Sequence, residues 1–237
     1  YVGSRDENVY ALDADSGNQQ WKFQTDAGVD SSPAVADGTV YVGSSDNNVY
    51  AIDADSGNQQ WRFQTGSGVG SSPAVADGTV YVGSFDSNAY ALDADTGDQQ
   101  WSFQTGSAVT SSPAVVNGTV YVGSEDDTVY AIDTDTGDEL WSFQTGYEVN
   151  PSPAVANDTV YVGSWDGLTY AIESQEGIAL TATSATVSRG GEATIDIDAE
   201  LVDQIQIEQL WTDWSVSADV PDSVYDDSTP GQITLSW

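Results

Sequence analysis

The tetrapeptide Tyr-Val-Gly-Ser stands at residues 1–4 and begins again at residues 41, 81, 121 and 161, so the sequence repeats every 40 residues. Each repeat contains four short segments rich in β-branched, aromatic and alternating apolar residues, which is the pattern of β-strands. In the second repeat these segments are residues 32–36, 39–43, 48–52 and 59–65. No segment has helical periodicity. The sequence therefore predicts an all-β protein.

The spacing of the turns predicts how the four strands are joined. Asp37-Gly38 separates the first two strands and suits a two-residue type I′ hairpin turn, in which both residues have positive φ. A period near 40 residues is typical of a β-propeller, in which one repeat forms one four-stranded blade. The chain starts inside the second strand of one copy, contains three complete copies and reaches the third strand of a fifth. We therefore expect about four to five blades, ending near residue 174 because Thr181 stands where the other copies have Trp.

The composition excludes several classes of function. The 237 residues include 38 Asp and Glu but only 4 Lys and Arg, giving a formal net charge of −34. Nucleic acids and anionic membrane surfaces repel such a chain, so we expect neither as a partner. His, Cys and Met are absent, which excludes Ser-His-Asp triads, disulfides and thiolate or imidazole metal ligands. We assign no catalytic residue to this sequence.

The acidity itself indicates an environment. Asp outnumbers Glu 29 to 9, and Lys22 is the single lysine. Aromatic residues make up 11% of the chain, which is unlike a disordered acidic segment. Self-repulsion of this charge is screened in roughly molar salt, where the Debye length is about 3 Å. We expect a protein of a halophile, and an ordinary acidic secreted protein is the alternative.

A recurring motif adds a family resemblance. Residues 11–21 read Ala-Leu-Asp-Ala-Asp-Ser-Gly-Asn-Gln-Gln-Trp, and the pattern returns at residues 51–61, 91–101 and 131–141. It resembles the tryptophan-docking motif of BamB-like propeller repeats of the pyrroloquinoline-quinone (PQQ) type. The resemblance covers residues 1–174 and implies that one Trp per blade packs against the neighbouring blade. The residues concerned are Trp21, Trp61, Trp101 and Trp141. Residues 188–195 and 210–214, in the C-terminal segment, resemble β modules near the C-termini of haloarchaeal surface proteins.

The same resemblance leaves two classes of function open. The family includes scaffold and surface proteins that bind no quinone, and dehydrogenases that hold a quinone beside Ca²⁺. No residue here matches a family catalytic motif, so we expect an interaction scaffold without a cofactor; a PQQ- and calcium-dependent dehydrogenase fragment is the alternative. Paired aspartates such as Asp13 and Asp15 could suggest a calcium loop, but Gly17 stands where a third acid would be needed. We interpret these pairs as turn residues and predict no metal site.

Differences between the copies indicate where a partner would bind. The turn between the second and third strands, and the connection from one blade to the next, vary among copies, whereas the turns at the opposite end hardly change. Variable loops on a rigid scaffold are typical recognition sites, although neutral drift is the alternative. The candidate partner-binding residues, for a protein or a glycan, are Arg5, Phe85, Glu125, Tyr147, Glu148 and Trp165.

Two further features concern location and the end of the chain. Asn117 and Asn157 begin Asn-x-Thr sequons at hairpin turns and are candidate glycosylation sites, which favours an extracellular or cell-surface protein. From about residue 175 the pattern changes, and residues 175–237 are predicted to be an incomplete immunoglobulin-like β segment, with strands at residues 182–188, 193–197 and 205–210. Ring closure is expected to need further blades or a second chain.

Overall fold

The computed structural model describes residues 1–173, 179–182, 192–197, 215–218 and 231–236. The strands of the first three sheets are β1 (Val2–Ser4), β2 (Asn8–Leu12), β3 (Gln19–Gln24), β4 (Ala34–Ala36), β5 (Thr39–Gly43), β6 (Asn48–Asp53), β7 (Gln59–Gln64), β8 (Ala74–Ala76), β9 (Thr79–Gly83), β10 (Asn88–Asp93) and β11 (Gln99–Gln104). Those of the next two are β12 (Ala114–Val116), β13 (Thr119–Gly123), β14 (Thr128–Asp133), β15 (Glu139–Gln144), β16 (Ala154–Ala156), β17 (Thr159–Gly163), β18 (Thr169–Glu173) and β19 (Ala179–Ala182). Last come β20 (Glu192–Ile197), β21 (Ser215–Ala218) and β22 (Gly231–Ser236).

Each blade is an antiparallel sheet whose strands follow chain order. Sheets β4–β7, β8–β11, β12–β15 and β16–β19 have four strands, and the first sheet, β1–β3, has three. The hairpin between the first two strands has the expected geometry, with Asp37 at φ 46° and Gly38 at φ 74°. The described residues contain strands and turns but no helix, so none of them forms a helix long and apolar enough to cross a membrane. The predicted all-β propeller fold is confirmed.

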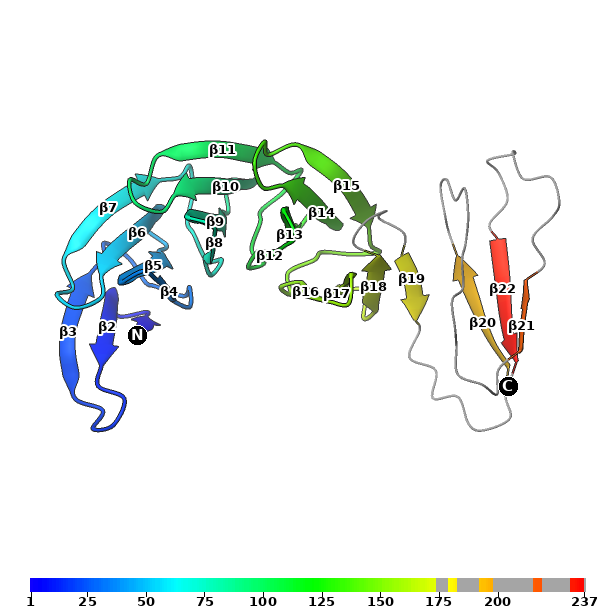
Figure 1. Cartoon of the computed structure of the whole chain (residues 1–237), viewed down its shortest axis with the longest axis horizontal. Helices are drawn as coiled ribbons and strands as arrows, with labels where there is room; N and C mark the ends of the chain where they lie inside the picture. Colours follow the sequence, from blue (N-terminus) through cyan, green and yellow to red (C-terminus); the bar gives the residue numbers. More distant parts are fainter. Residues whose placement is uncertain (174–178, 183–191, 198–214, 219–230, 237) are drawn as a thin grey trace.

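The five blades follow one another along an open arc (Figure 1). The short strands β4, β8, β12 and β16 line its inner side, and β3, β7, β11 and β15 form its outer side. Hydrogen bonds exactly one repeat apart tie the inner strands together: the backbone N–H of Ser32, Ser72 and Ser112 donates to the Oγ of Ser72, Ser112 and Ser152, at 2.9–3.0 Å. The inner side is therefore held by the same bond at the three junctions from the second blade to the fifth.

Aromatic side chains fill the space between blades. At the junction of the second and third blades, Tyr41 and Trp61 pack in one buried cluster with Val82 and Leu92 of the next blade. The indole Nε1 of Trp61 donates to the carbonyl of Ala94 at 2.8 Å, and the Tyr41 hydroxyl donates to the same oxygen at 3.2 Å. Trp21 and Trp101 make the equivalent bonds, to Ala54 and Thr134. Each indole thus satisfies its N–H while burying its ring.

A glycine in the next blade makes room for each indole. Gly97 has φ +75°, and a Cβ at this position would lie 2.6 Å from the Trp61 ring. Gly57 and Gly137 stand in the same way against Trp21 and Trp101. Only glycine combines this backbone conformation with such close approach, which explains why the motif couples Gly and Trp at a fixed distance.

The fifth blade corrects one sequence expectation. The repeats were expected to end near residue 174, before a fourth strand, because Thr181 stands at the Trp position. In the structure, β19 is a fourth strand that pairs with β18 along its whole length. Its register places Leu180 opposite Ala171, whereas Trp141 stands opposite Ala131 in the fourth blade. In the fourth blade a β-bulge between Ala131 and Ile132 places Trp141 opposite Ala131. The pairing of β18 with β19 has no such shift, so Leu180 and not Thr181 stands opposite Ala171.

The C-terminal prediction falls largely outside the described residues. Strands β20, β21 and β22 form one antiparallel sheet in the order β20-β22-β21. Strand β20 includes the predicted strand at residues 193–197, whereas nearly all of 182–188 and all of 205–210 lie outside the described residues.

Candidate interaction face

One end of the arc carries the variable loops, and we call it the loop face. It consists of the turns between the second and third strands of each blade (residues 5–7, 45–47, 85–87, 125–127 and 165–167) and the connections between blades (residues 26–30, 66–70, 106–110 and 146–150). Each connection accepts a hydrogen bond from the next blade's turn, as from the Phe85 N–H to the Gly68 carbonyl at 2.9 Å. The connection at 66–70 also packs on the turn before it, near Ser45. Turns and connections therefore alternate in one continuous band.

A partly buried carboxylate joins the turn to the preceding connection at each junction. Asp86 Oδ2 accepts hydrogen bonds from the Tyr90 hydroxyl at 2.7 Å and from the Gly66 backbone N–H of the preceding connection at 2.6 Å. Burial acts to raise the pKa of Asp86, but the bonds donated by Tyr90, Asn88 and Gly66 outweigh it and lower the pKa. The carboxylate is thus held charged. The same bonds recur at Asp46, Asp126 and Asp166, with Tyr50, Tyr130 and Tyr170.

Sequence reasoning missed these Asp–Tyr pairs. Their signal is Asp four residues before Tyr, recurring every 40 residues as in Asp46 and Tyr50. Because the Asp follows the variable position directly, its side chain anchors the backbone that carries the variable side chain. The loop face therefore combines Asp–Tyr hydrogen bonds that recur in each copy of the repeat with exposed residues that differ between the copies.

We expect Tyr130→Phe to lower the free energy of unfolding by an amount that depends on pH. Burial first, then the hydrogen bond to Asp126 and its charge, raise the pKa of Tyr130 to about 12. A raised folded-state pKa stabilises the fold fully below the ordinary value of about 10, and the contribution is lost as the pH rises through about 12. At pH 8 the variant should lose about 1–2 kcal/mol of unfolding free energy, and the deficit should shrink above pH 10. Urea unfolding at pH 8 and 11 measures both. Tyr147→Phe, at an exposed position, is the control; an equal deficit at both pH values would contradict the prediction.

The candidate partner-binding residues lie along the band in different environments. Arg5 Nε donates to Asp30 Oδ1 at 2.6 Å in an exposed ion pair between the first turn and the first connection. Phe85 is 48% exposed and its ring covers the connection at Gly68 and Gly70. Both interactions join a turn to the connection beside it.

The other four candidates gather at the fourth connection. Trp165 is 67% exposed, and its backbone N–H donates to the Glu148 carbonyl at 3.0 Å. Tyr147 is 52% exposed. Burial and then the charge of Glu148 raise the pKa of Glu125, which places two carboxylates in one electrostatic environment. The structure thus places two exposed aromatic residues and two acids on one connection and the turns next to it.

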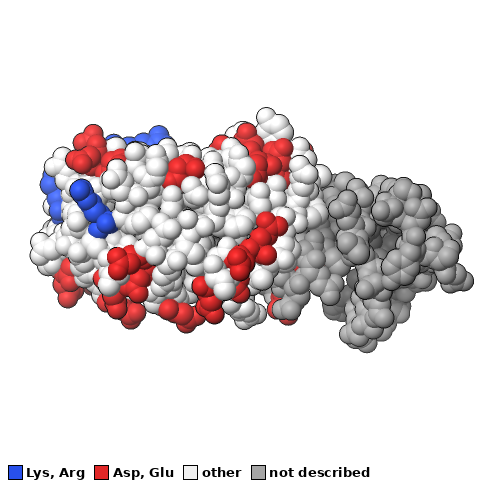
Figure 2. Space-filling view, turned by 90° about the horizontal axis from the view of Figure 1, so that it is seen from above, with Lys and Arg blue, Asp and Glu red and all other residues white. Residues whose placement is uncertain are grey.

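Charge is distributed unevenly over the surface. In the view of Figure 2, Asp and Glu gather along the two long edges of the described region, with a band of uncharged residues between them. Lys and Arg lie at one end of that view, in keeping with Lys22, Arg5 and Arg62 in the first two blades. A partner that approaches the fourth and fifth blades therefore meets no basic side chain from the described residues.

The paired aspartates form turns at the opposite end of the blades. Asp93 Oδ1 accepts hydrogen bonds from the N–H and hydroxyl of Thr96, at 2.8 and 3.0 Å, which lower its pKa. Ser or Thr serves Asp13, Asp53 and Asp133 in the same way. In the part of the chain that the structure describes, no three acidic side chains gather at a distance suited to a metal ion.

The sequon residues are exposed. Asn117 and Asn157 both stand at hairpin turns with φ 51°. A left-handed turn favours Asn whether or not a glycan is attached, so their position permits modification without requiring it.

Stacked four-stranded blades joined through buried tryptophans define this protein as a repeat propeller. The family described as outer membrane protein assembly factor BamB matches residues 1–71 and 48–206, so the chain belongs to the BamB-like PQQ-repeat family. No curated protein gave a significant match.

Three solved structures share the fold. BamB from Moraxella catarrhalis is 19% identical with a TM-score of 0.67, over 75% of this chain and 59% of that one. The computationally designed Ika8 protein is 20% identical with a TM-score of 0.68, over 82% and 64%. The quinohemoprotein alcohol dehydrogenase ADHIIG from Pseudomonas putida HK5 is 21% identical with a TM-score of 0.63, over 75% and 39%. The chain thus spans less than two thirds of each of these proteins, and the likeness concerns the fold alone.

Proposed function

We propose that this chain is a non-enzymatic scaffold that binds a protein or glycan partner through its loop face. The proposal rests on one observation. The exposed loop residues, among them Phe85 and Trp165, differ between the copies of the repeat, whereas the Asp–Tyr pairs that fix the backbone beneath them recur in every copy. Aromatic rings that are exposed on a rigid surface are favoured anchors for partners. The family description, an assembly factor, supports a role in bringing other molecules together.

The fourth and fifth blades have the chemistry for the main contact. Trp165 and Tyr147 offer flat apolar surface, and Glu125 and Glu148 offer negative charge beside it. A Lys or Arg side chain of a protein partner would relieve the repulsion between these carboxylates and stack on the aromatic rings. A sugar ring would use the aromatic surface alone. The two classes of partner therefore differ in their dependence on the acids.

The high acidity supports a location in concentrated salt, on the outside of a halophilic cell. Exposed Asn117 and Asn157 agree with export. We propose that both carry glycans in the native protein, which mass spectrometry of protein isolated from its source cells would test. Unmodified sequons in such material would remove this support for export.

We expect Phe85→Ala, Tyr147→Ala and Trp165→Ala together to weaken partner binding by more than tenfold, a loss of about 1.4 kcal/mol or more. Binding would be measured in about 2 M KCl, where surface charge is screened, against glycan arrays and purified cell-surface proteins of halophiles. Leu140→Ala, at an exposed position outside the loop face, is the matched control. If the triple variant stays folded and retains full affinity for a partner of the wild type, the loop face is not the binding surface.

The proposal includes no cofactor. Calorimetric titration with PQQ and Ca²⁺ in about 3 M KCl, a concentration that screens the net charge, should give no saturable heat with the folded chain. Saturable, calcium-dependent binding near one quinone per molecule would instead support the dehydrogenase alternative.

A further inference from the structure

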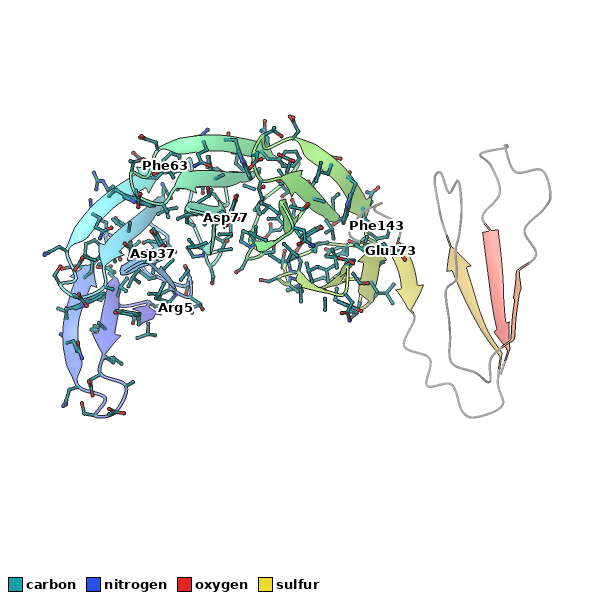
Figure 3. All side chains as sticks on the ribbon, viewed as in Figure 1. Arg5, Asp37, Phe63, Asp77, Phe143 and Glu173 are labelled. Carbon is teal, nitrogen blue, oxygen red and sulfur yellow. The ribbon has the colours of Figure 1, made fainter. Side chains whose placement is uncertain are left out.

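The hairpin turn between the first two strands has one shape in the second, third and fourth blades but not one sequence. Asp37-Gly38 and Asp77-Gly78 form it between β4 and β5 and between β8 and β9 (Figure 3), with φ 46° and 49° at Asp and φ 74° and 73° at Gly. Asn117-Gly118 forms it in the fourth blade, with φ 51° and 78°. The same backbone conformation therefore holds aspartate in two blades and asparagine in the third.

Asparagine followed by glycine is a chemically reactive pair. The backbone nitrogen of Gly118 can attack Cγ of the Asn117 side chain, and residue 118 has no Cβ to shield that nitrogen. Both residues are exposed. A Cβ built on Gly118 would meet one atom within 4 Å outside its chain neighbours, the Oγ1 of Thr134 at 3.8 Å. The pair is therefore open and accessible to water.

The fourth blade adds a hydrogen bond to this turn that the second and third blades lack. The N–H and the hydroxyl of Thr134 both donate to the Gly118 carbonyl, at 3.0 and 3.1 Å. Ala54 and Ala94 stand at the same position in the other two blades and donate to the glycine carbonyl through the N–H alone, each at 2.9 Å. The reactive asparagine thus coincides with a second bond on the glycine that follows it.

We propose that Asn117 is a site of spontaneous deamidation through Gly118, and that the Thr134 hydroxyl slows the reaction. The Gly118 nitrogen forms a bond to Cγ of Asn117 and gives up its proton, while the bond from Cγ to the side-chain nitrogen breaks and ammonia leaves. Water then opens the resulting succinimide ring at one of its two carbonyls, which leaves aspartate or isoaspartate. Ring closure rotates the peptide plane of Gly118, and the Thr134 hydroxyl bond opposes that movement.

The turn fits one of the two products. Aspartate at residue 117 reproduces the Asp-Gly turns of the second and third blades, whose φ values lie within about 5° of those of Asn117 and Gly118. Isoaspartate lengthens the backbone by one methylene group and does not fit a two-residue turn. We therefore expect Asn117→Asp to keep the melting temperature of the parent chain within about 1 °C.

The fifth blade supplies a matched comparison. Asn157-Asp158 forms the same exposed turn, with φ 51° and 57°, but the residue after this asparagine carries a side chain. The full chain is produced without glycans, because a glycan would occupy the nitrogen that leaves. It is incubated folded in about 2 M KCl, which screens its charge, and then digested for mass spectrometry. We expect Asn117 to deamidate at least about tenfold faster than Asn157, since the nitrogen of Gly118 is unshielded. Asp158→Gly should raise the rate at Asn157 by about the same factor.

Thr134→Ala tests the effect of the hydroxyl. The variant carries the residue of the second and third blades and keeps the backbone N–H. Deamidation of Asn117 should become about fivefold faster, the factor that one hydrogen bond contributes, and the rate at Asn157 should not change. Equal rates at the two asparagines, or an Asn117 that reacts in urea but stays intact in the folded chain, would overturn the proposal. An unchanged rate in Thr134→Ala would overturn the role of the hydroxyl.

Discussion

Trp61→Ala is expected to lower the free energy of unfolding by about 3–5 kcal/mol, the range for deleting a large buried aromatic side chain. The indole is 8% exposed, packs against Tyr41 with ring centroids 5.8 Å apart and donates the hydrogen bond to Ala94. Its loss leaves a cavity between two blades and removes one of the two hydrogen bonds that the Ala94 carbonyl accepts, the other coming from Tyr41. Urea unfolding monitored by far-UV circular dichroism measures the change.

Two controls separate the junction from general destabilisation. Phe85→Ala removes an aromatic ring from the exposed loop face and should change the unfolding free energy by about 0.5 kcal/mol or less. Trp61→Phe should recover part of the loss, because it restores apolar volume without the N–H donor. A loss below about 1 kcal/mol for Trp61→Ala would show that the blades are held by other contacts, since even partial collapse of the site leaves a larger cost.

Salt should have the second large effect, with a rise in melting temperature of at least about 10 °C between 0.1 and 2 M KCl. The net charge of −34 is spread over the chain, and the Debye length falls from about 10 Å at 0.1 M salt to about 3 Å at 1 M and less at 2 M. A gain of about 3 kcal/mol corresponds to roughly 10 °C for a chain of this size. Differential scanning calorimetry in a KCl series measures it.

A variant with fewer acidic residues distinguishes the screening of charge repulsion from the other effects of salt on stability. Asp15, Asp55, Asp95 and Asp135 are exposed at equivalent positions of four blades, and changing all four to Asn removes four charges from the turns. This variant should be more stable than the parent in 0.1 M KCl and nearly equal to it in 2 M KCl. Sucrose strengthens the burial of apolar surface without screening charge. Adding sucrose should therefore leave the difference in stability between the variant and the parent in 0.1 M KCl almost unchanged. A fold equally stable at both salt concentrations would contradict the halophilic interpretation.

Most of the fold could be predicted from the sequence because the copies of the repeat can be compared with one another. The Asp37-Gly38 turn and the spacing of apolar segments recur in register, so an error in one copy is corrected by the others. The fourth strand of the fifth blade could not be placed because it has a single copy. The β-bulge of the other blades is absent from this pairing, which places Leu180, instead of Thr181, at the tryptophan position.

The candidate site could be located but not described from the sequence. Variation at positions such as Phe85 and Trp165 predicted exposed loops, since exposed positions change most freely, and both side chains are exposed; whether they bind a partner stays a prediction. That Arg5 pairs with Asp30, or that Glu125 lies within the field of Glu148, depends on contacts between residues about 25 apart across a junction. Such contacts leave no periodic signal in a single sequence.

The junction bonds repeated 40 residues apart have a consequence for how the molecule comes apart. The junction hydrogen bonds of the described blades join immediate neighbours, so the stability of these blades is approximately a sum of blade and junction terms along one dimension. Unfolding should therefore proceed blade by blade, with the loss of one junction at a time.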